Sequence, residues 1–127
     1  MATKDKYASV LALGEQLGVR DGRVEEENGI LNIWGTVNTP YEKDQLWDEI
    51  KSLNGGIVPR DVIADIKVTD NSVYTRHTVQ KGESLSLIAK HYYKDLMEYK
   101  KIFEANRDQL SDPDKIEVGQ VLVVPNP

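Results

Sequence analysis

A short polar stretch at Thr69–Ser72 divides this chain of 127 residues into two parts, and neither part is large. Acidic residues concentrate in the first part: residues 1–73 hold 13 Asp and Glu against 8 Lys and Arg, whereas residues 74–127 hold 8 of each. A change of charge balance beside a polar stretch is typical of a domain boundary. The sequence therefore predicts two small domains, residues 1–70 and 74–127, joined by a linker at residues 71–73.

Length and composition exclude several classes of protein. Each part is too short for a doubly wound or barrel enzyme. The formal charge of -5 argues against nucleic acid or an anionic membrane as the partner, because both bind best to a concentrated basic patch. The absence of cysteine excludes a disulfide framework, a thiolate zinc site and a cysteine nucleophile.

The N-terminal sequence predicts neither a signal peptide nor a membrane span. Lys4, Asp5 and Lys6 precede a short apolar stretch at Ala8–Leu13, and Glu15 interrupts it. A membrane span needs a much longer apolar run, of about 20 residues. We therefore expect a cytoplasmic protein.

The first part begins with a helix and a hairpin. Apolar residues at helical spacing predict a helix that ends at Gly18 and is formed around Tyr7, Val10, Leu11, Gly14 and Leu17. Asn28-Gly29 then joins two extended segments, and this pair tolerates the positive φ angles of a two-residue hairpin turn. The chain is therefore expected to turn back on itself at Asn28-Gly29.

A second helix and a third strand complete the first part. Thr39, Pro40 and Glu42 form the pattern of a capping box with proline at the first helical position. The helix should end at residues 54–56 and bury Leu46, Trp47, Ile50 and Leu53. Alternating apolar residues then predict a strand that contains Val62, Ala64, Ile66 and Val68. The predicted order is α-β-β-α-β.

The second part is expected to have the order β-α-α-β. The β-branched and aromatic run Val73–Val79 predicts a strand. Ser84 caps a helix that buries Leu85, Ile88, Ala89 and Tyr92, and the same spacing recurs in Tyr99, Ile102, Phe103 and Asn106. The last strand is Val121–Val124, which Pro125 ends. The predicted fold class of the whole chain is α+β.

Three segments of the second part carry a family pattern: HTVQKGESLSLIAKHYY, IFEANRD and DKIEVGQVLVVP. They resemble the LysM module, with its first strand, its Gly-Asp-Thr-Leu turn, its central Asn and its final Gly-Gln-x-Leu strand. Glu83 and Ser84 stand where that family usually has Asp and Thr, which preserves both the acid and the capping hydroxyl. The resemblance implies binding of a glycan that contains N-acetylglucosamine, such as peptidoglycan or chitin.

The first part has a shorter pattern, Gly29-x-x-x-Ile33-x-Gly35-x-Val37 ahead of a helix. It resembles the BON domain. A BON domain followed closely by LysM is similar to the bacterial potassium-binding family of that architecture. That resemblance implies a K+ ligand and a site in the first part.

The residues that could carry catalysis do not form a known arrangement. His77 and His91 are separated by a strand and a helix, and neither lies in a catalytic motif. The acidic run at residues 25–27 lies on a predicted strand, so at most two of its carboxylates could converge; it is a solvated face or, alternatively, a patch for a divalent cation. Asp112 and Asp114 flank a proline and are expected to shape a turn. We therefore expect no enzyme.

The LysM resemblance implies a shallow glycan groove between two loops, formed by Gly82, Glu83, Ser84 and Leu85 and by Asp114, Lys115 and Ile116. Backbone amides and carbonyls there would bind acetamido groups, with Leu85 and Ile116 beneath the methyl groups. The alternative is that Ser84 only caps a helix while Leu85 and Ile116 fill the core.

The second candidate site holds a monovalent cation. Potassium is large and weakly hydrated, and backbone carbonyls replace its water shell well. The irregular stretch after the second helix supplies such carbonyls from Asn54, Gly55, Gly56, Ile57 and Pro59, beside a helix end with free carbonyls. The alternative is that Gly55 only ends the helix.

The expected compartment decides between these ligands, because a protein without an export signal does not meet the cell wall, whereas K+ is abundant in the cytoplasm. We therefore expect a potassium-binding protein in which the ion, held near the domain interface, changes the arrangement of the two domains. Glycan binding is the alternative. The sequence carries no oligomer signal, and we expect a monomer.

Overall fold

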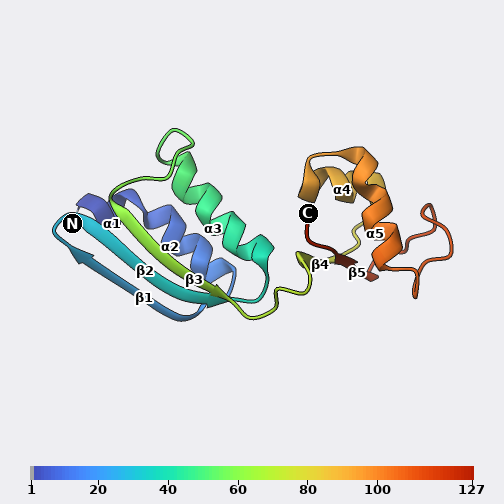
Figure 1. Ribbon diagram of the computed structural model, residues 1–127, viewed down its shortest axis with the longest axis horizontal. Coiled ribbons are helices and arrows are strands. Elements are labelled where there is room, and N and C mark those ends of the chain that lie inside the picture. Colours follow the sequence, from blue (N-terminus) through green and yellow to red (C-terminus); the bar gives the residue numbers. More distant parts are fainter. Residues whose placement is uncertain (1) are drawn as a thin grey trace. The chain divides into compact units, whose positions relative to one another are not determined.

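The computed structural model describes residues 2–127, so the start of the first predicted domain, at Met1, lies outside the described residues. The chain divides into two compact units between Asn71 and Ser72. Both units combine helices with strands, which confirms the predicted α+β class (Figure 1). None of the helices within residues 2–127 is long and apolar enough to cross a membrane.

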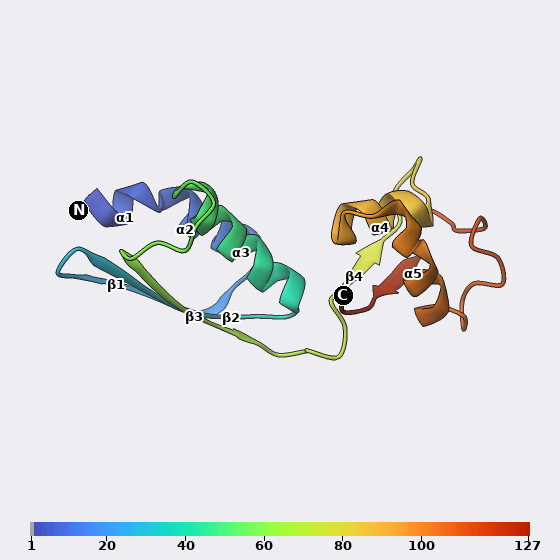
Figure 2. The same ribbon diagram turned by 45° about the horizontal axis from the view of Figure 1, so that its top comes forward.

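The first unit has a three-stranded sheet with helices on one of its faces (Figures 1 and 2). The strands β1 (Arg20–Glu27), β2 (Ile30–Val37) and β3 (Val62–Val68) lie in the order β1-β2-β3. The β1–β2 pair is antiparallel and the β2–β3 pair is parallel, so the chain crosses over the sheet through α3 (Pro40–Ser52). Two shorter helices, α1 (Ala2–Lys6) and α2 (Ala8–Gln16), precede the strands.

The apolar core of this unit lies between the helices and the sheet. Alternate residues of β2 and β3 face the helices and are buried or half-buried, as the period of a strand requires. The buried residues are Tyr7, Val10, Leu31, Val37, Leu46, Ile50, Val62 and Ile66.

Two turns follow directly from residues that accept a positive φ angle. Asn28 and Gly29 have φ angles of 54° and 77°, and Glu27 pairs with Ile30 across the turn, which confirms the predicted hairpin. Gly18, with φ 71°, ends α2: its N–H donates to the Glu15 carbonyl, and the N–H of the next residue donates to the Gly14 carbonyl.

The structure corrects three details of the first unit. The predicted first helix is interrupted at Tyr7, which separates α1 from α2. Leu53 is 38% exposed rather than buried, because it is the residue just beyond the end of α3. The Thr39 hydroxyl donates to the Glu42 carboxylate at 3.2 Å instead of accepting from the helix backbone, so the capping box does not form.

The second unit packs helices against a two-stranded antiparallel sheet, β4 (Thr75–Thr78) with β5 (Val121–Val124). Between the strands lie α4 (Leu85–Tyr93), the short 3-10 helix η1 (Leu96–Glu98) and α5 (Tyr99–Ala105). The predicted first strand is thus shorter than expected. The core comprises Val79, Leu85, Ile88, Ala89, Ile102, Leu110 and Leu122.

Candidate functional site

The predicted cation loop follows α3 and is exposed. Gly55 and Gly56 have φ angles of 67° and 88°, a region that an L side chain rarely adopts. Ile57 and Val58 are 67% and 60% exposed, so they contribute little to the core. The glycines therefore turn an irregular backbone segment toward solvent at the end of α3.

Hydrogen bonds distinguish the end of α3 from the loop that follows it. The Lys51 carbonyl accepts from the N–H groups of Asn54 and Gly56, and the Ile50 carbonyl accepts from Asn54 Nδ2. The prediction that the carbonyls at the helix end are free is therefore wrong for these two. The Asn54 carbonyl accepts from the Ile57 N–H at 3.4 Å. Within residues 2–127, no hydrogen-bond donor reaches the carbonyls of residues 55–59.

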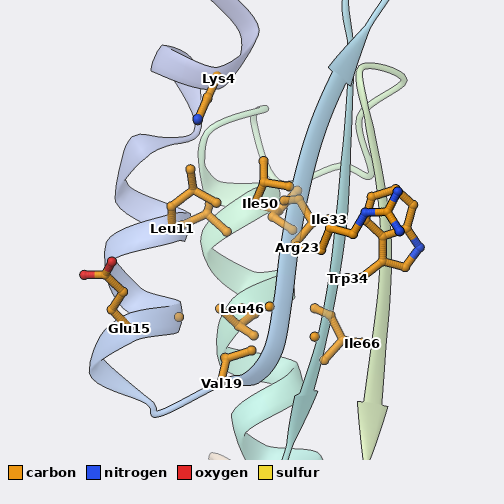
Figure 3. Close-up of a pocket in the computed structure, with 15 residues that line it drawn as sticks. Lys4, Leu11, Glu15, Val19, Arg23, Ile33, Trp34, Leu46, Ile50 and Ile66 are labelled. Atoms are coloured by element: carbon orange, nitrogen blue, oxygen red, sulfur yellow. The ribbon is translucent and has the colours of Figure 1, made fainter.

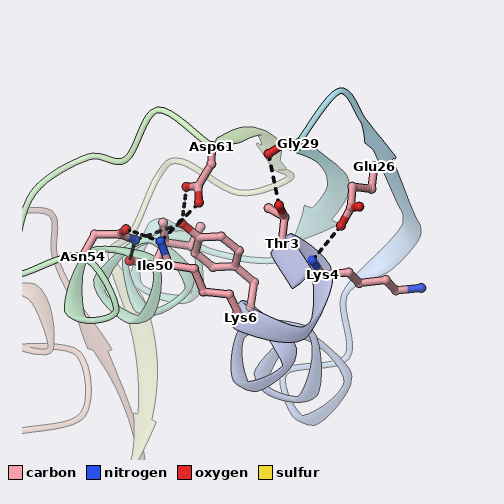
Figure 4. Close-up of polar contacts among 9 residues, drawn as sticks. Thr3, Lys4, Lys6, Glu26, Gly29, Ile50, Asn54 and Asp61 are labelled. Carbon is pink, nitrogen blue, oxygen red and sulfur yellow. Dashed lines mark hydrogen bonds and ion pairs between the residues drawn. The ribbon is translucent and has the colours of Figure 1, made fainter. Parts of the chain in front are cut away.

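A polar cluster that sequence reasoning missed lies beside this loop (Figure 4). The Tyr7 hydroxyl donates to Asp61 Oδ1 at 2.5 Å and accepts from Asn54 Nδ2 at 3.0 Å. Lys6 Nζ donates to Asn54 Oδ1 at 2.8 Å and to Asp61 Oδ2 at 3.2 Å. The Asn54 side chain is thus hydrogen-bonded within the protein, and its oxygen already accepts from the Lys6 ammonium group.

The cluster keeps its members in defined charge states. The hydrogen bond from Tyr7 lowers the pKa of the Asp61 carboxyl against the opposing effect of desolvation, and Lys6 lowers it further. Desolvation and the bond to Asp61 raise the pKa of Tyr7. The bond to Asp61 also raises the pKa of Lys6. At neutral pH a carboxylate, a neutral phenol and an ammonium group therefore lie together.

The first glycan loop is largely engaged in structural contacts. Gly82 has φ 85°, and the Ser84 hydroxyl accepts from the Leu87 N–H, which confirms it as the cap of α4. Glu83 Oε1 accepts from the Gln80 N–H at 2.6 Å and lies 2.8 Å from His77 Nε2. The side chains of Glu83 and Ser84, the Glu83 N–H and the Ser84 carbonyl are thus already paired within the unit.

The apolar residues of the glycan prediction belong to the core. Leu85 is only 2% exposed and Ile116 is half-buried against the same cluster, as the alternative interpretation required. Asp114 and Lys115 are exposed. Asp112 Oδ1 accepts from the Asp114 N–H at 2.8 Å, so this aspartate shapes a turn as predicted.

The remaining acidic and histidine candidates do not converge. Glu25 pairs with Arg23, whereas Glu26 Oε1 accepts from the backbone N–H of Lys4. Among residues 2–127 there is no group of three or more His, Asp or Glu side chains placed to hold a metal ion. His77 lies against Tyr92 and Glu83, and the ring of His91 contacts the Tyr92 ring.

The Glu83 contacts predict an acid-sensitive second unit. Desolvation raises the pKa of Glu83, but the hydrogen bonds from His77 and the Gln80 N–H outweigh it, so the pKa lies below its ordinary value of 4.5. The ionised carboxylate therefore stabilises the fold above that value, and this contribution is lost as pH falls through the lower folded pKa.

We expect Glu83→Gln to lower the free energy of unfolding of the second unit by about 1–2 kcal/mol at pH 7 and by much less at pH 3. Urea unfolding, followed through NMR signals of the second unit at both pH values, measures this difference. An equal loss at pH 7 and pH 3 would show that the charge of Glu83 is not responsible.

Comparison with known proteins assigns a family to part of the chain. The LysM domain model matches residues 77–125, all within the second unit. The second unit contains a LysM domain. This confirms the predicted family of the second part, whereas the comparisons leave the BON resemblance of the first part a prediction.

Two relatives match part of the chain. An uncharacterized protein of Deinococcus radiodurans is 55% identical over 51 residues, which are 40% of this chain and 19% of that protein. The potassium binding protein Kbp of Escherichia coli is 51% identical over 49 residues, which are 39% of this chain and 33% of that protein. The matched segments thus span a third or less of the relatives' own length.

Proposed function

We propose that this chain is a cytoplasmic, non-enzymatic potassium-binding protein. The carbonyls of Gly55, Gly56, Ile57 and Pro59 bind the ion, with a weaker contribution from Asn54, whose carbonyl already accepts a hydrogen bond. The observation that carries the proposal is the run of carbonyls at residues 55–59 without a protein donor. The similarity to a relative named for potassium binding supports it.

The chemistry of the loop suits K+ better than a divalent ion. A large, weakly hydrated cation exchanges water for several neutral carbonyl oxygens, whereas Mg²⁺ and Ca²⁺ favour carboxylates. Two consecutive glycines at positive φ give the loop freedom to turn successive carbonyls toward one point. The carboxylate of Asp61, by contrast, is already paired with Lys6 and Tyr7.

The two tryptophans make the first unit separately observable. Trp34 and Trp47 are the tryptophans of the sequence, and both lie in the first unit, so tryptophan fluorescence reports the unfolding of that unit alone. We expect the first unit to melt at a higher temperature in KCl than in NaCl of the same ionic strength. A ligand at 100 times its Kd adds about 2.7 kcal/mol to the free energy of unfolding.

Two glycine variants separate ion binding from backbone strain. Gly56 and Gly18 both have positive φ angles, and a Cβ at either position would meet no atom within 4 Å. Gly56→Ala and Gly18→Ala should therefore destabilise the unit by a similar amount, of about 1–2 kcal/mol. Only Gly56→Ala should also reduce the difference between KCl and NaCl. Equal melting of the unaltered protein in both salts would contradict the proposal.

A change in the arrangement of the two units is a further step of the proposal. If K+ favours one arrangement, the ion shifts a population between states. Small-angle scattering should then give a smaller radius of gyration in KCl than in NaCl. An unchanged radius would reject this step while leaving ion binding itself to the melting experiment.

Glycan binding is the second candidate, and the LysM match favours it. The groove would use backbone groups around Gly82 and Ser84 and the exposed Asp114 and Lys115, because Glu83 is engaged and Leu85 is buried. Chitooligosaccharide should then shift NMR signals of the second unit and leave the tryptophan melting curve unchanged. A glycan response without a potassium response would reverse the order of the two proposals.

A further inference from the structure

A pocket of about 450 Å³ lies in the first unit between α2 and the β1–β2 hairpin (Figure 3). Its volume falls in the range of small-molecule sites. Buried Leu46 and Ile50 form its floor, and half-buried Leu11, Val24 and Ile33 form its walls. Aliphatic side chains thus make up most of the interior, and Lys4, Glu15, Arg23 and Trp34 also line the pocket.

Gly14 indicates that the pocket is a feature of the sequence rather than a packing defect. This glycine lies inside α2 and lines the pocket, although glycine stabilises a helix less than alanine does. Its φ angle is not positive, and a Cβ would meet only Val19 Cγ2, at the ordinary distance of 3.6 Å. Neither backbone conformation nor crowding thus requires glycine at position 14. The absence of a side chain there leaves space in the pocket.

The charged residues lie at the rim. Arg23 is occupied on the opposite face of the sheet, where its guanidinium lies 4.7 Å from the centre of the Trp34 ring and pairs with Glu25. The Glu15 carboxylate points away from the sheet (Figure 3). Lys4 remains as the basic group beside the opening. An aliphatic interior with a cation at its rim suits an alkyl chain that ends in a carboxylate.

We propose that this pocket binds a medium-chain alkyl carboxylate, with the chain against Leu11, Ile33 and Leu46 and the carboxylate at Lys4. Burial of the chain supplies the driving force, because most of the surface that lines the pocket is apolar. This site is separate from the cation loop and does not depend on potassium binding.

Decanoate and 1-decanol, below the concentrations at which they form aggregates, test the proposal on the full chain. Both should raise the melting temperature of the first unit, read by tryptophan fluorescence, and decyltrimethylammonium should bind at least several-fold more weakly than decanoate. Lys4→Gln should lower the affinity for decanoate severalfold and leave the affinity for decanol unchanged. Equal binding of the anionic and cationic amphiphiles would overturn the role of Lys4.

Variants of α2 test the location of the site. Gly14→Leu should fill the pocket and reduce the affinity for decanoate at least tenfold. Gly14→Ala should raise the melting temperature of the first unit in the absence of ligand and still lower its affinity for decanoate. Damage to the fold would not produce these two opposite effects together. The control is Ala12→Gly, at an exposed position of the same helix, which should lower the melting temperature and keep the ligand shift. No shift in the unaltered protein, or an unchanged shift in both Gly14 variants, would overturn the proposal.

Discussion

Asn106→Ala should lower the free energy of unfolding of the LysM unit by about 3–5 kcal/mol, enough to unfold much of it. Asn106 is fully buried, and its Nδ2 donates to the carbonyls of Ile102 at 2.7 Å and Val123 at 2.8 Å. Its Oδ1 accepts from the Val123 N–H at 2.8 Å. The amide thus pairs with β5 as a neighbouring strand would, and alanine leaves the N–H and the carbonyl of half-buried Val123 without this partner.

Urea unfolding of the two units measures this effect, with NMR signals of the LysM unit compared with tryptophan fluorescence of the first unit. The matched control is Gln109→Ala, which also removes a side-chain amide from β5: Gln109 Nε2 donates to the Val121 carbonyl at 2.9 Å, but this residue is exposed. We expect a loss of at most about 1 kcal/mol for the control. Similar losses in the free energy of unfolding for both variants would show that the burial of Asn106 does not determine how much it stabilises the unit.

Tyr7→Ala should destabilise the first unit by about 3–5 kcal/mol, because it removes a fully buried aromatic side chain from the core. Tyr7→Phe keeps the ring and removes only the hydroxyl, which joins Asp61 to Asn54. We expect that variant to lose about 1–2 kcal/mol. Tryptophan fluorescence during urea unfolding reports both values.

The same pair of variants separates packing from the polar cluster. Since Tyr7 lowers the pKa of Asp61, the carboxylate stabilises the unit at neutral pH and loses this contribution as pH falls through its folded pKa. The cost of Tyr7→Phe should therefore shrink in acid, whereas the cavity cost of Tyr7→Ala should persist. A Phe variant as unstable as the Ala variant would contradict this division.

Local chemistry explains which elements could be predicted. Asn28-Gly29 specified a hairpin turn because both residues accept positive φ angles, and Ser84 specified the start of α4 because its hydroxyl satisfies a helix N–H. Helical spacing placed Leu46 and Ile50 in the core but also included Leu53, which lies just past the helix end. Periodicity finds a face of a helix and is least reliable at its boundary.

The candidate site shows the opposite case. The cation loop was visible as Gly55-Gly56 after a helix, but the partners of Asn54 were not, because Lys6 and Tyr7 lie almost 50 positions earlier in the chain. Leu85 illustrates the same limit: an apolar residue beside a capping serine fits a glycan groove or a core equally well until its burial is known.

The sequence by itself determined the two-part division of charge, the order of helices and strands, the turns that need glycine or asparagine, and the LysM pattern of the second part. Each of these depends on residues close together in the chain. Only the tertiary structure decided that Lys6, Tyr7, Asn54 and Asp61 form one cluster, that Asn106 completes β5, and that α2 stands over a pocket lined by Gly14. Those features require distant segments to meet, and such contacts leave no local pattern in the amino-acid order.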